Sequence, residues 1–355
     1  KINFKILKCK YHLSLVQTQL LIHFFIIYEY LLYIGGMRMV IVVVLFVIGF
    51  ILISKGADFF INATVEIGRK TNISELILGA TIVSFATTLP ELTVSLFASI
   101  DNHATMSLGN AVGSIICNTG LILGMVIFIS PFKADRKTFA SKSIILLLSI
   151  IALFILGVDG SITRLDGCIL LMILAIYMYT NYKGILNDTS KNYLYYCMTQ
   201  QNEMSGLKIT VSFLCGLIMM IIGSRLLVDN GVEIASFIGI PQGIISLTVI
   251  ALGTSLPELV SSITAVRKKH HEICVGNILG ANILNIVSVI AISAMPNSIP
   301  ILSQNVRIDY PFMVILVLTL IIPTIIKHKL YRLQGLIMLG TYITYLAILY
   351  YTYII

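Results

Sequence analysis

Long apolar blocks alternate with short polar breaks from about residue 39 to the end of the chain. Each block is long enough to cross the hydrocarbon core of a bilayer as a helix, which takes about 20 residues. We therefore expect an all-α polytopic protein of the cell membrane, a multi-pass chain surrounded by the lipid bilayer. The predicted transmembrane helices are ten in number, at residues 39–66, 73–99, 105–130, 138–157, 162–182, 207–236, 241–266, 273–294, 308–326 and 331–354.

Basic residues divide unequally between alternate breaks and their flanks. The first set holds fifteen: Arg69, Lys70, Lys133, Arg136, Lys137, Lys142, Lys183, Lys191, Lys208, Arg267, Lys268, Lys269, Lys327, Lys329 and Arg332. The second set holds only Arg164 and Arg307, or three with Arg38. Since Lys and Arg collect in cytoplasmic loops, both ends of the ten-helix core are predicted to face outside.

The longest polar break separates two halves of the chain. Residues 183–206 are predicted to form a cytoplasmic linker between a first five-helix repeat, 37–182, and a second, 207–355. Residues 1–36 contain no Met, and polar side chains interrupt their apolar stretch. Three interpretations of this extension stay open: translated leader sequence upstream of the true start, an extra span or anchor, and a cleaved signal.

Composition removes several classes of function. With 57% hydrophobic and 11% charged residues, no room remains for a soluble catalytic domain. The 24 Lys and Arg against 16 Asp and Glu are spread over separate breaks, so no nucleic-acid-binding patch is expected. The six cysteines form no CxxC pair and are interpreted as buried thiols. We expect no enzyme, no catalytic residues and no cofactor, and a monomer fits the pattern.

An internal repeat is the strongest signal in the sequence. A shift of 167 residues aligns 56–118 with 223–285 without a gap, and about 20 of the 63 positions are identical. The segment Thr-Thr-Leu-Pro-Glu-Leu at 87–92 matches Thr-Ser-Leu-Pro-Glu-Leu at 254–259. A Gly-Asn-x-x-Gly segment follows in each copy, at 109–113 and 276–280.

The two copies are predicted to be inverted in the membrane. Five predicted helices separate equivalent points, so the second copy enters the bilayer from the opposite side. Inverted repeats with interrupted helices at matching positions are typical of secondary transporters, whose substrate site lies near the midplane where the repeats meet.

Pro90 and Pro257 lie in the middle of predicted spans, where proline removes a helix hydrogen bond and clashes with the carbonyl four residues earlier. Each helix is therefore expected to break there. The carbonyls freed over about 84–87 and 251–254 must line a polar cavity or coordinate ions, because lipid offers them no partner. Close-spaced Gly109 and Gly113, and likewise Gly276 and Gly280, are expected to allow close backbone approach.

A carboxylate follows each proline. Helical spacing places the hydroxyls of Thr87 and Thr88 on the face of Glu91, and those of Thr254 and Ser255 on the face of Glu258. Two charges at midplane cost roughly 5–7 kcal/mol on insertion scales. Bound cations are the natural counter-charge. Ser114, Asn118 and Asn285 are positioned to reach the same cavity, and this all-oxygen set favours Ca²⁺ or Na⁺.

These motifs resemble the cation/calcium exchanger superfamily, in particular its prokaryotic sodium/calcium exchanger-like branch. The resemblance covers about residues 39–355, with the two alpha repeats near 56–130 and 223–294. It implies that Glu91 and Glu258 are acidic ligands shared by calcium and sodium. Thr87, Thr254 and the carbonyls of Ser84 and Ala251 would add contacts. The sodium sites and the central polar position would be completed by Thr88, Ser255, Ser114, Asn118 and Asn285.

Two positions depart from the family pattern. Many relatives have Asp at the position of Asn285, and Ser at the position of Ala281. The first change lowers the formal charge of the site from minus three to minus two, and it argues against potassium coupling. The second removes a hydroxyl from an outer sodium site.

We therefore expect an antiporter that exchanges calcium for sodium at one glutamate-centred site. A calcium/proton exchanger is the nearest alternative, because a proton can replace sodium as the counter-charge on a buried glutamate. A passive cation channel is a third possibility. The hydroxyl-rich surroundings of the two carboxylates favour sodium.

Overall fold

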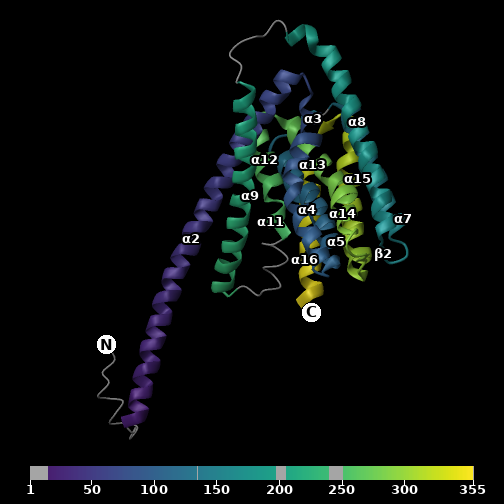
Figure 1. Ribbon diagram of the computed structural model, residues 1–355. Helices are drawn as coiled ribbons and strands as arrows, with labels where there is room; N and C mark the ends of the chain where they lie inside the picture. The colour runs from purple at the N-terminus through teal and green to yellow at the C-terminus, as the bar shows by residue number, and fades with distance from the viewer. Residues whose placement is uncertain (1–14, 134, 197–204, 240–250, 355) are drawn as a thin grey trace.

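The computed structural model describes residues 15–133, 135–196, 205–239 and 251–354, with side chains placed for 38–133, 135–186, 205–239 and 253–352. This part of the chain is almost entirely helical (Figure 1). The first half of the chain contains α2 (Leu15–Thr71), α3 (Glu75–Leu78), η1 (Gly79–Val83), α4 (Ser84–Ile100), α5 (Ala104–Ile116), η2 (Cys117–Leu123), α6 (Gly124–Ile129), β1 (Phe132–Lys133), α7 (Arg136–Leu156), β2 (Ser161–Ile162) and α8 (Arg164–Tyr196), so that α2 begins before the predicted first repeat and α8 runs into the predicted linker. The second contains α9 (Gly206–Phe237), α11 (Ala251–Thr254), α12 (Leu256–Arg267), α13 (His271–Leu284), η4 (Asn285–Ile290), α14 (Ala291–Ser293), β3 (Ile299–Pro300), η5 (Asn305–Asp309), α15 (Tyr310–Lys327), β4 (Lys329–Leu330) and α16 (Arg332–Ile354). Elements labelled η are π-helical turns.

The predicted spans are confirmed within the described residues. Nine helical segments there are long and apolar enough to cross a membrane. Part of the predicted span 241–266 lies outside the described residues, and its remainder forms α11 and α12. The prediction was wrong in counting Lys142 with the loop flanks. Lys142 lies inside α7, where it is buried, donates a hydrogen bond to Asn181 and stands over the ring of Tyr177.

Backbone details repeat at the spacing that the sequence repeat predicts. Left-handed residues end equivalent helices at Asn72 and Gly239, and again at Asn102 and Lys269, each pair 167 residues apart. The π-helical turns η2 and η4 also occupy matching positions. Strand β1 pairs with β4, and β3, its equivalent in the second repeat, pairs with β2. Each short sheet therefore joins one repeat to the other.

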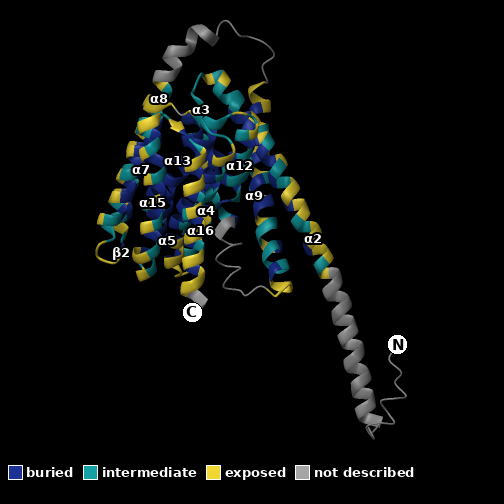
Figure 2. Ribbon diagram, turned by 180° about the vertical axis from the view of Figure 1, so that it is seen from behind, coloured by how far each residue is buried: buried dark blue, intermediate teal, exposed yellow. Residues whose placement is uncertain are grey.

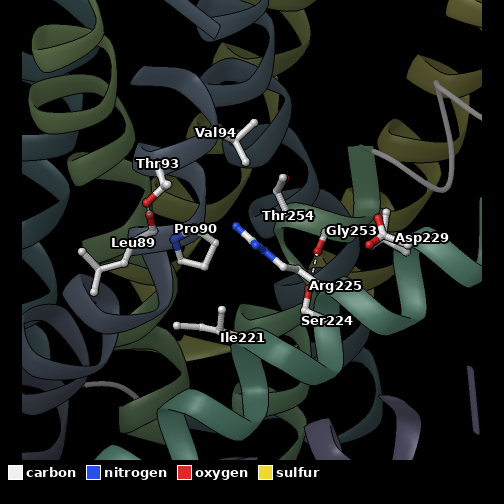
Figure 3. A pocket seen from close by; sticks show the side chains of 11 residues that line it. Leu89, Pro90, Thr93, Val94, Ile221, Ser224, Arg225, Asp229, Gly253 and Thr254 are labelled. Carbon is white, nitrogen blue, oxygen red and sulfur yellow. Dashed lines mark hydrogen bonds between the residues drawn. The ribbon is translucent and has the colours of Figure 1, made fainter. Parts of the chain in front are cut away.

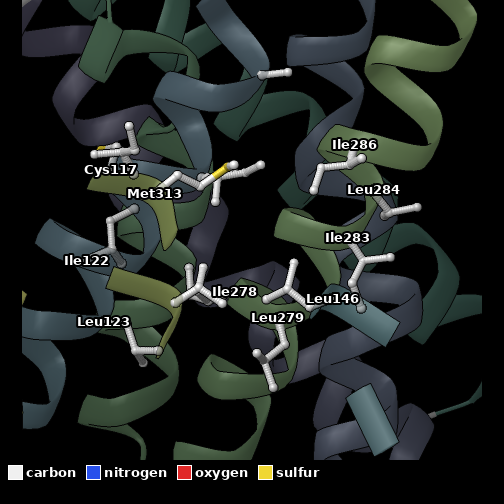
Figure 4. Packing of buried hydrophobic residues seen from close by; sticks show 14 of the residues in the cluster. Cys117, Ile122, Leu123, Leu146, Ile278, Leu279, Ile283, Leu284, Ile286 and Met313 are labelled. Atoms are coloured by element: carbon white, nitrogen blue, oxygen red, sulfur yellow. The ribbon is translucent and has the colours of Figure 1, made fainter. Parts of the chain in front are cut away.

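The core is built around the helix that runs from His271 to Ser293 and is buried over almost its whole length. Its first part, α13, packs against α3, η1, α4 and α12. Leucine and isoleucine side chains from α13, η4, η2 and α7 fill the surrounding space (Figure 4). Helices α2 and α9 lie at the periphery of this core and pack along each other, with many exposed apolar side chains (Figures 1 and 2). Such faces are suited to lipid.

Glycines let α2 and α9 approach closely. A side chain added at Gly49 or Gly56 would meet the backbone of α9 at 3.0 Å or less, and one added at Gly216 or Gly223 would meet that of α2. No hydrophobic force drives helices together in lipid, so such crossings depend on the close packing that small residues allow. The two peripheral helices therefore form a tightly packed pair.

The two prolines act differently on their helices. In the second repeat the chain leaves helical geometry at Ser255, with ψ at 7°, and helix α12 restarts with Pro257 near its beginning. In the first repeat α4 continues through Pro90, and the irregularity lies upstream in η1. The wider turn of η1 re-routes backbone hydrogen bonds before Pro90 is reached. The predicted break is therefore confirmed at Pro257, whereas the predicted break at Pro90 is wrong, because the helix continues through that proline.

Candidate functional site

Glu91 on α4 and Glu258 on α12 are fully buried and lie side by side. Their carboxyl groups are close enough to interact directly, although they belong to opposite repeats. No described N–H or O–H group makes a hydrogen bond of acceptable geometry to any of their four carboxyl oxygens. Buried acceptors of this kind are rare in proteins, and an adjacent like-charged pair is more costly still. Two ionised carboxylates in this position are unfavourable unless a cation or a bound proton compensates their charge.

Two threonines flank the carboxyl pair. Thr87 lies next to the Glu258 carboxyl, and its hydroxyl donates to the side-chain oxygen of Asn277 at 3.2 Å and more weakly to the Ser84 carbonyl at 3.4 Å. Thr254 makes the equivalent bond to the side-chain oxygen of Asn110, also at 3.2 Å. Neither threonine hydroxyl makes a hydrogen bond of acceptable geometry to a carboxyl oxygen of Glu91 or Glu258.

The remaining predicted hydroxyls are also buried. The Ser255 hydroxyl lies 3.3 Å from that of Ser114, which joins α5 to the break before α12. The Thr88 hydroxyl has no hydrogen-bond partner among the described residues. The structure therefore brings Ser255 and Ser114 together across the repeats and leaves a further oxygen unused at Thr88.

Two amides complete the predicted set. Asn118, in η2, donates to Asn282 at 3.4 Å, while its amide oxygen stays without a donor among the described residues. Asn282 in turn donates to Thr119. Asn285 opens η4, which packs against α4 and α5, and neither atom of its amide has a partner in the described part of the chain.

The backbone carbonyls that were predicted to line a cavity or bind ions differ in whether the protein already supplies a hydrogen bond to them. Ser84 begins α4 directly after η1, and its carbonyl accepts a weak bond from the Thr87 hydroxyl. The Gly253 carbonyl, which Pro257 frees from its helix, accepts a hydrogen bond from Ser224 on α9 at 2.8 Å. This carbonyl therefore already has a hydrogen-bond partner in the protein. The prediction that the freed carbonyls of 251–254 line a polar cavity or coordinate ions does not hold for it as an ion ligand. Ala251 is the first described residue of α11, and the segment before it lies outside the described residues.

A cavity of about 430 Å³ reaches this region from one side (Figure 3). It lies between α4, α9 and α11 and is lined by Pro90, Ser224 and Thr254 among others. The Arg225 side chain points into it towards Pro90 and Thr254, while Asp229 is turned away. By the predicted topology this cavity lies on the outer half of the protein.

Charged contacts join α12 to α2 on the opposite half. Lys268, at the end of α12, forms an ion pair with Asp58 on α2 at 2.9 Å and donates to the side chain of Asn62 at 2.7 Å. The other repeat-matched glutamates have structural partners: Glu66 pairs with Arg69, and Glu233 pairs with Arg38, both at 2.7 Å. The charges of these two carboxylates are therefore compensated by arginines of the protein itself.

The sequence interpretation overlooked Asn110 and Asn277. Both belong to the Gly-Asn-x-x-Gly segments, which were interpreted through their glycines alone. The duplicated asparagine was the available signal, since a polar residue repeated inside a buried span is unusual. Within the described residues, no three His, Cys, Asp or Glu side chains gather in one cluster. The polar centre is thus made of two acids, hydroxyls and amides.

Comparison with known proteins places these features in a family. A family model described as sodium/calcium exchanger protein matches residues 41–183 and 208–351. The uncharacterized membrane protein MJ0091 of Methanocaldococcus jannaschii is 33% identical over 85% of this chain and 96% of its own. The sodium/calcium exchanger MaX1 of Methanosarcina acetivorans is 26% identical over 86% of this chain and 97% of its own.

The three-dimensional comparison agrees. A structure of the sodium-calcium exchanger NCX_Mj, soaked with sodium and strontium, has a TM-score of 0.76 and 32% identity, and the match covers 87% of this chain and 99% of that one. Both repeats are included in the family match, and the structural match spans nearly the whole relative. This multi-pass membrane protein therefore belongs to the sodium/calcium exchanger family.

Proposed function

We propose that the protein is a secondary active antiporter that exchanges Ca²⁺ for Na⁺ at one site centred on Glu91 and Glu258. The observation that carries this proposal is the pair of buried carboxyl groups without hydrogen-bond donors among the described residues. Calcium takes six to eight oxygen ligands in flexible geometry, and a buried carboxylate pair supplies both charge and oxygens.

Further ligands come from the oxygens around the two acids. The hydroxyls of Thr87 and Thr254 and the free oxygens of Thr88 and Asn118 are suited to the role. Ser255 and Ser114 share one contact across the repeats. Asn285 supplies an amide oxygen, and the carbonyls of Ser84 and Ala251 complete the proposed set. The transported ions are the substrate, and their coordination replaces the hydrogen bonds that the glutamates lack.

Exchange follows from charge compensation. An empty site would carry two unpaired charges through a low-dielectric barrier, whereas either ion load neutralises them. The site can therefore change between outward-facing and inward-facing states at low energetic cost only when ions are bound to it. The cavity beside α9 and the ion pair between Lys268 and Asp58 suit a state open on the predicted outer side. Sliding or rocking of the peripheral pair α2 and α9 would open the other side.

The coupling ion is tested by calcium uptake into proteoliposomes. Vesicles loaded separately with Na⁺, K⁺ or acidic buffer are diluted into calcium medium, with ionophores holding the membrane potential at zero. We expect rapid uptake only with the sodium gradient. Uptake driven only by the pH gradient would establish calcium/proton exchange instead, and uptake independent of any counter-ion would indicate a channel.

Arg225 gives a second prediction, because a guanidinium in a cation pathway opposes cation approach. A unit charge about 10 Å from a divalent ion contributes on the order of 1 kcal/mol in a high-dielectric cavity, or about fivefold in affinity. Arg225→Gln is therefore expected to tighten calcium binding about fivefold at low ionic strength, and much less at high ionic strength, where salt screens the charge.

Arg225→Lys serves as the matched control, since it keeps the charge. Calcium dissociation constants measured by titration calorimetry at two ionic strengths test the idea. Equal effects of the Gln and Lys substitutions, or an effect that salt does not reduce, would show that Arg225 acts through packing.

A further inference from the structure

We propose that Asn110 and Asn277 are positioning residues that orient the ligand hydroxyls of Thr254 and Thr87, each across the boundary between the repeats. The inference rests on the proposed function, and it assigns the Gly-Asn-x-x-Gly motif a chemical role. A hydroxyl has one proton and two lone pairs. It can coordinate a cation well only when its proton is donated elsewhere, away from the ion.

The orientation of Asn110 is fixed by its own repeat. Its amide nitrogen donates to the Ser95 hydroxyl at 2.9 Å and to the backbone carbonyl of Glu91 at 3.4 Å. A backbone carbonyl can only accept, so the nitrogen must face Glu91. The amide oxygen therefore faces the other way, where it accepts the proton of Thr254 from the second repeat.

Asn277 is held by a similar series of hydrogen bonds, although its serine partner is not the repeat equivalent of Ser95. The Ser261 hydroxyl donates to the backbone carbonyl of Glu258 at 3.1 Å, so its oxygen is available to accept from the amide nitrogen of Asn277 at 3.2 Å. The amide oxygen of Asn277 then accepts the proton of Thr87 from the first repeat. Both series of hydrogen bonds thus start at the backbone carbonyl of a site glutamate and end at the threonine of the opposite repeat.

The alternative acceptor for Thr87 explains why an asparagine is needed. Without Asn277, the hydroxyl proton would turn to another oxygen beside it, the Ser84 carbonyl at 3.4 Å or the neighbouring Glu258 carboxyl. Both of these oxygens are proposed ligands. The asparagine therefore keeps the Thr87 oxygen and these neighbouring oxygens available to the ion. This outer support resembles the way that residues behind a metal ligand fix the ligand's orientation.

Double-mutant cycles on calcium binding test the assignment. Calcium dissociation constants are measured by calorimetry on purified protein in sodium-free buffer. Asn277→Ala is expected to raise the dissociation constant about fivefold, the effect of one lost neutral hydrogen bond. In a Thr87→Val background the same substitution is expected to have no further effect, because no hydroxyl remains to be oriented. In a Thr87→Ser background its effect should return.

The structure supplies non-partner controls. Asn277→Ala combined with Thr254→Val, and Asn110→Ala combined with Thr87→Val, should be additive, whereas Asn110→Ala with Thr254→Val should not. A merely structural asparagine would affect binding equally in all backgrounds, and that result would overturn the proposal. Should one asparagine variant fail to fold, the other cycle stands alone. Absence of calcium binding by the unaltered protein would instead refute the proposed function.

Discussion

Glu91→Gln and Glu258→Gln are each expected to reduce sodium-driven calcium uptake to the level of protein-free vesicles. Glutamine has nearly the same shape, so the change removes charge and adds an amide donor. One remaining carboxylate cannot neutralise Ca²⁺, and a buried partly compensated ion is strongly unfavourable. Both carboxylates are completely buried, so solvent offers no compensation. Uptake into proteoliposomes, normalised to inserted protein, measures the loss.

Glu66→Gln and Glu233→Gln are the matched controls. These glutamates also correspond across the repeat, yet each already has an arginine partner. Ion pairs this exposed contribute at most about 1 kcal/mol, so transport should stay close to that of the unaltered protein. Normal transport by either site variant, or equal loss in the control variants, would remove the assignment of the site.

The second large effect is expected at Gly276, where α13 crosses α3 and η1. A methyl group there would overlap the carbonyl oxygen of Leu76 and lie 2.9 Å from the backbone nitrogen of Ala80. These backbone atoms cannot relieve the overlap by rotating to another rotamer, as a side chain could. Gly276→Ala is therefore expected to lower the free energy of unfolding by about 3 kcal/mol, at the upper end for overpacked sites.

The same crossing positions Asn277 against α4, so Gly276→Ala should also weaken calcium binding. Gly340→Ala on α16 is the control, because a methyl group there meets no described heavy atom within 4 Å. Alanine favours helix, so this variant should be as stable as the unaltered protein or slightly more stable. Thermal unfolding in detergent compares them. Equal melting temperatures for the two variants would contradict the close contact at the crossing.

Much of the fold could be predicted because the bilayer restricts the solutions so strongly. Apolar length alone locates the spans, and the 167-residue repeat predicts that the two halves are inverted. The repeat even extends to backbone detail, as the left-handed Asn72 and Gly239 show. Family resemblance supported the same architecture, which the family and structural matches confirm.

The details that could not be predicted depend on packing between distant segments. Whether Pro90 opens α4 depends on how η1 redistributes hydrogen bonds, which no local rule gives. The sequence predicts Lys142 as a flanking charge because it does not show the partners Asn181 and Tyr177, which lie on another helix. Asn277 was missed because its partner Thr87 belongs to the other repeat. Spacing along one helix reveals a shared face, but it does not identify what that face meets.

Equilibrium calcium binding under sodium competition tests the central claim most directly. Radioactive calcium is bound to purified protein while sodium is raised, with choline keeping ionic strength constant. We expect a single class of calcium site that sodium empties completely, and no binding in Glu91→Gln or Glu258→Gln. Calcium retained by either variant, or calcium that sodium fails to displace, would contradict one shared site between the two glutamates.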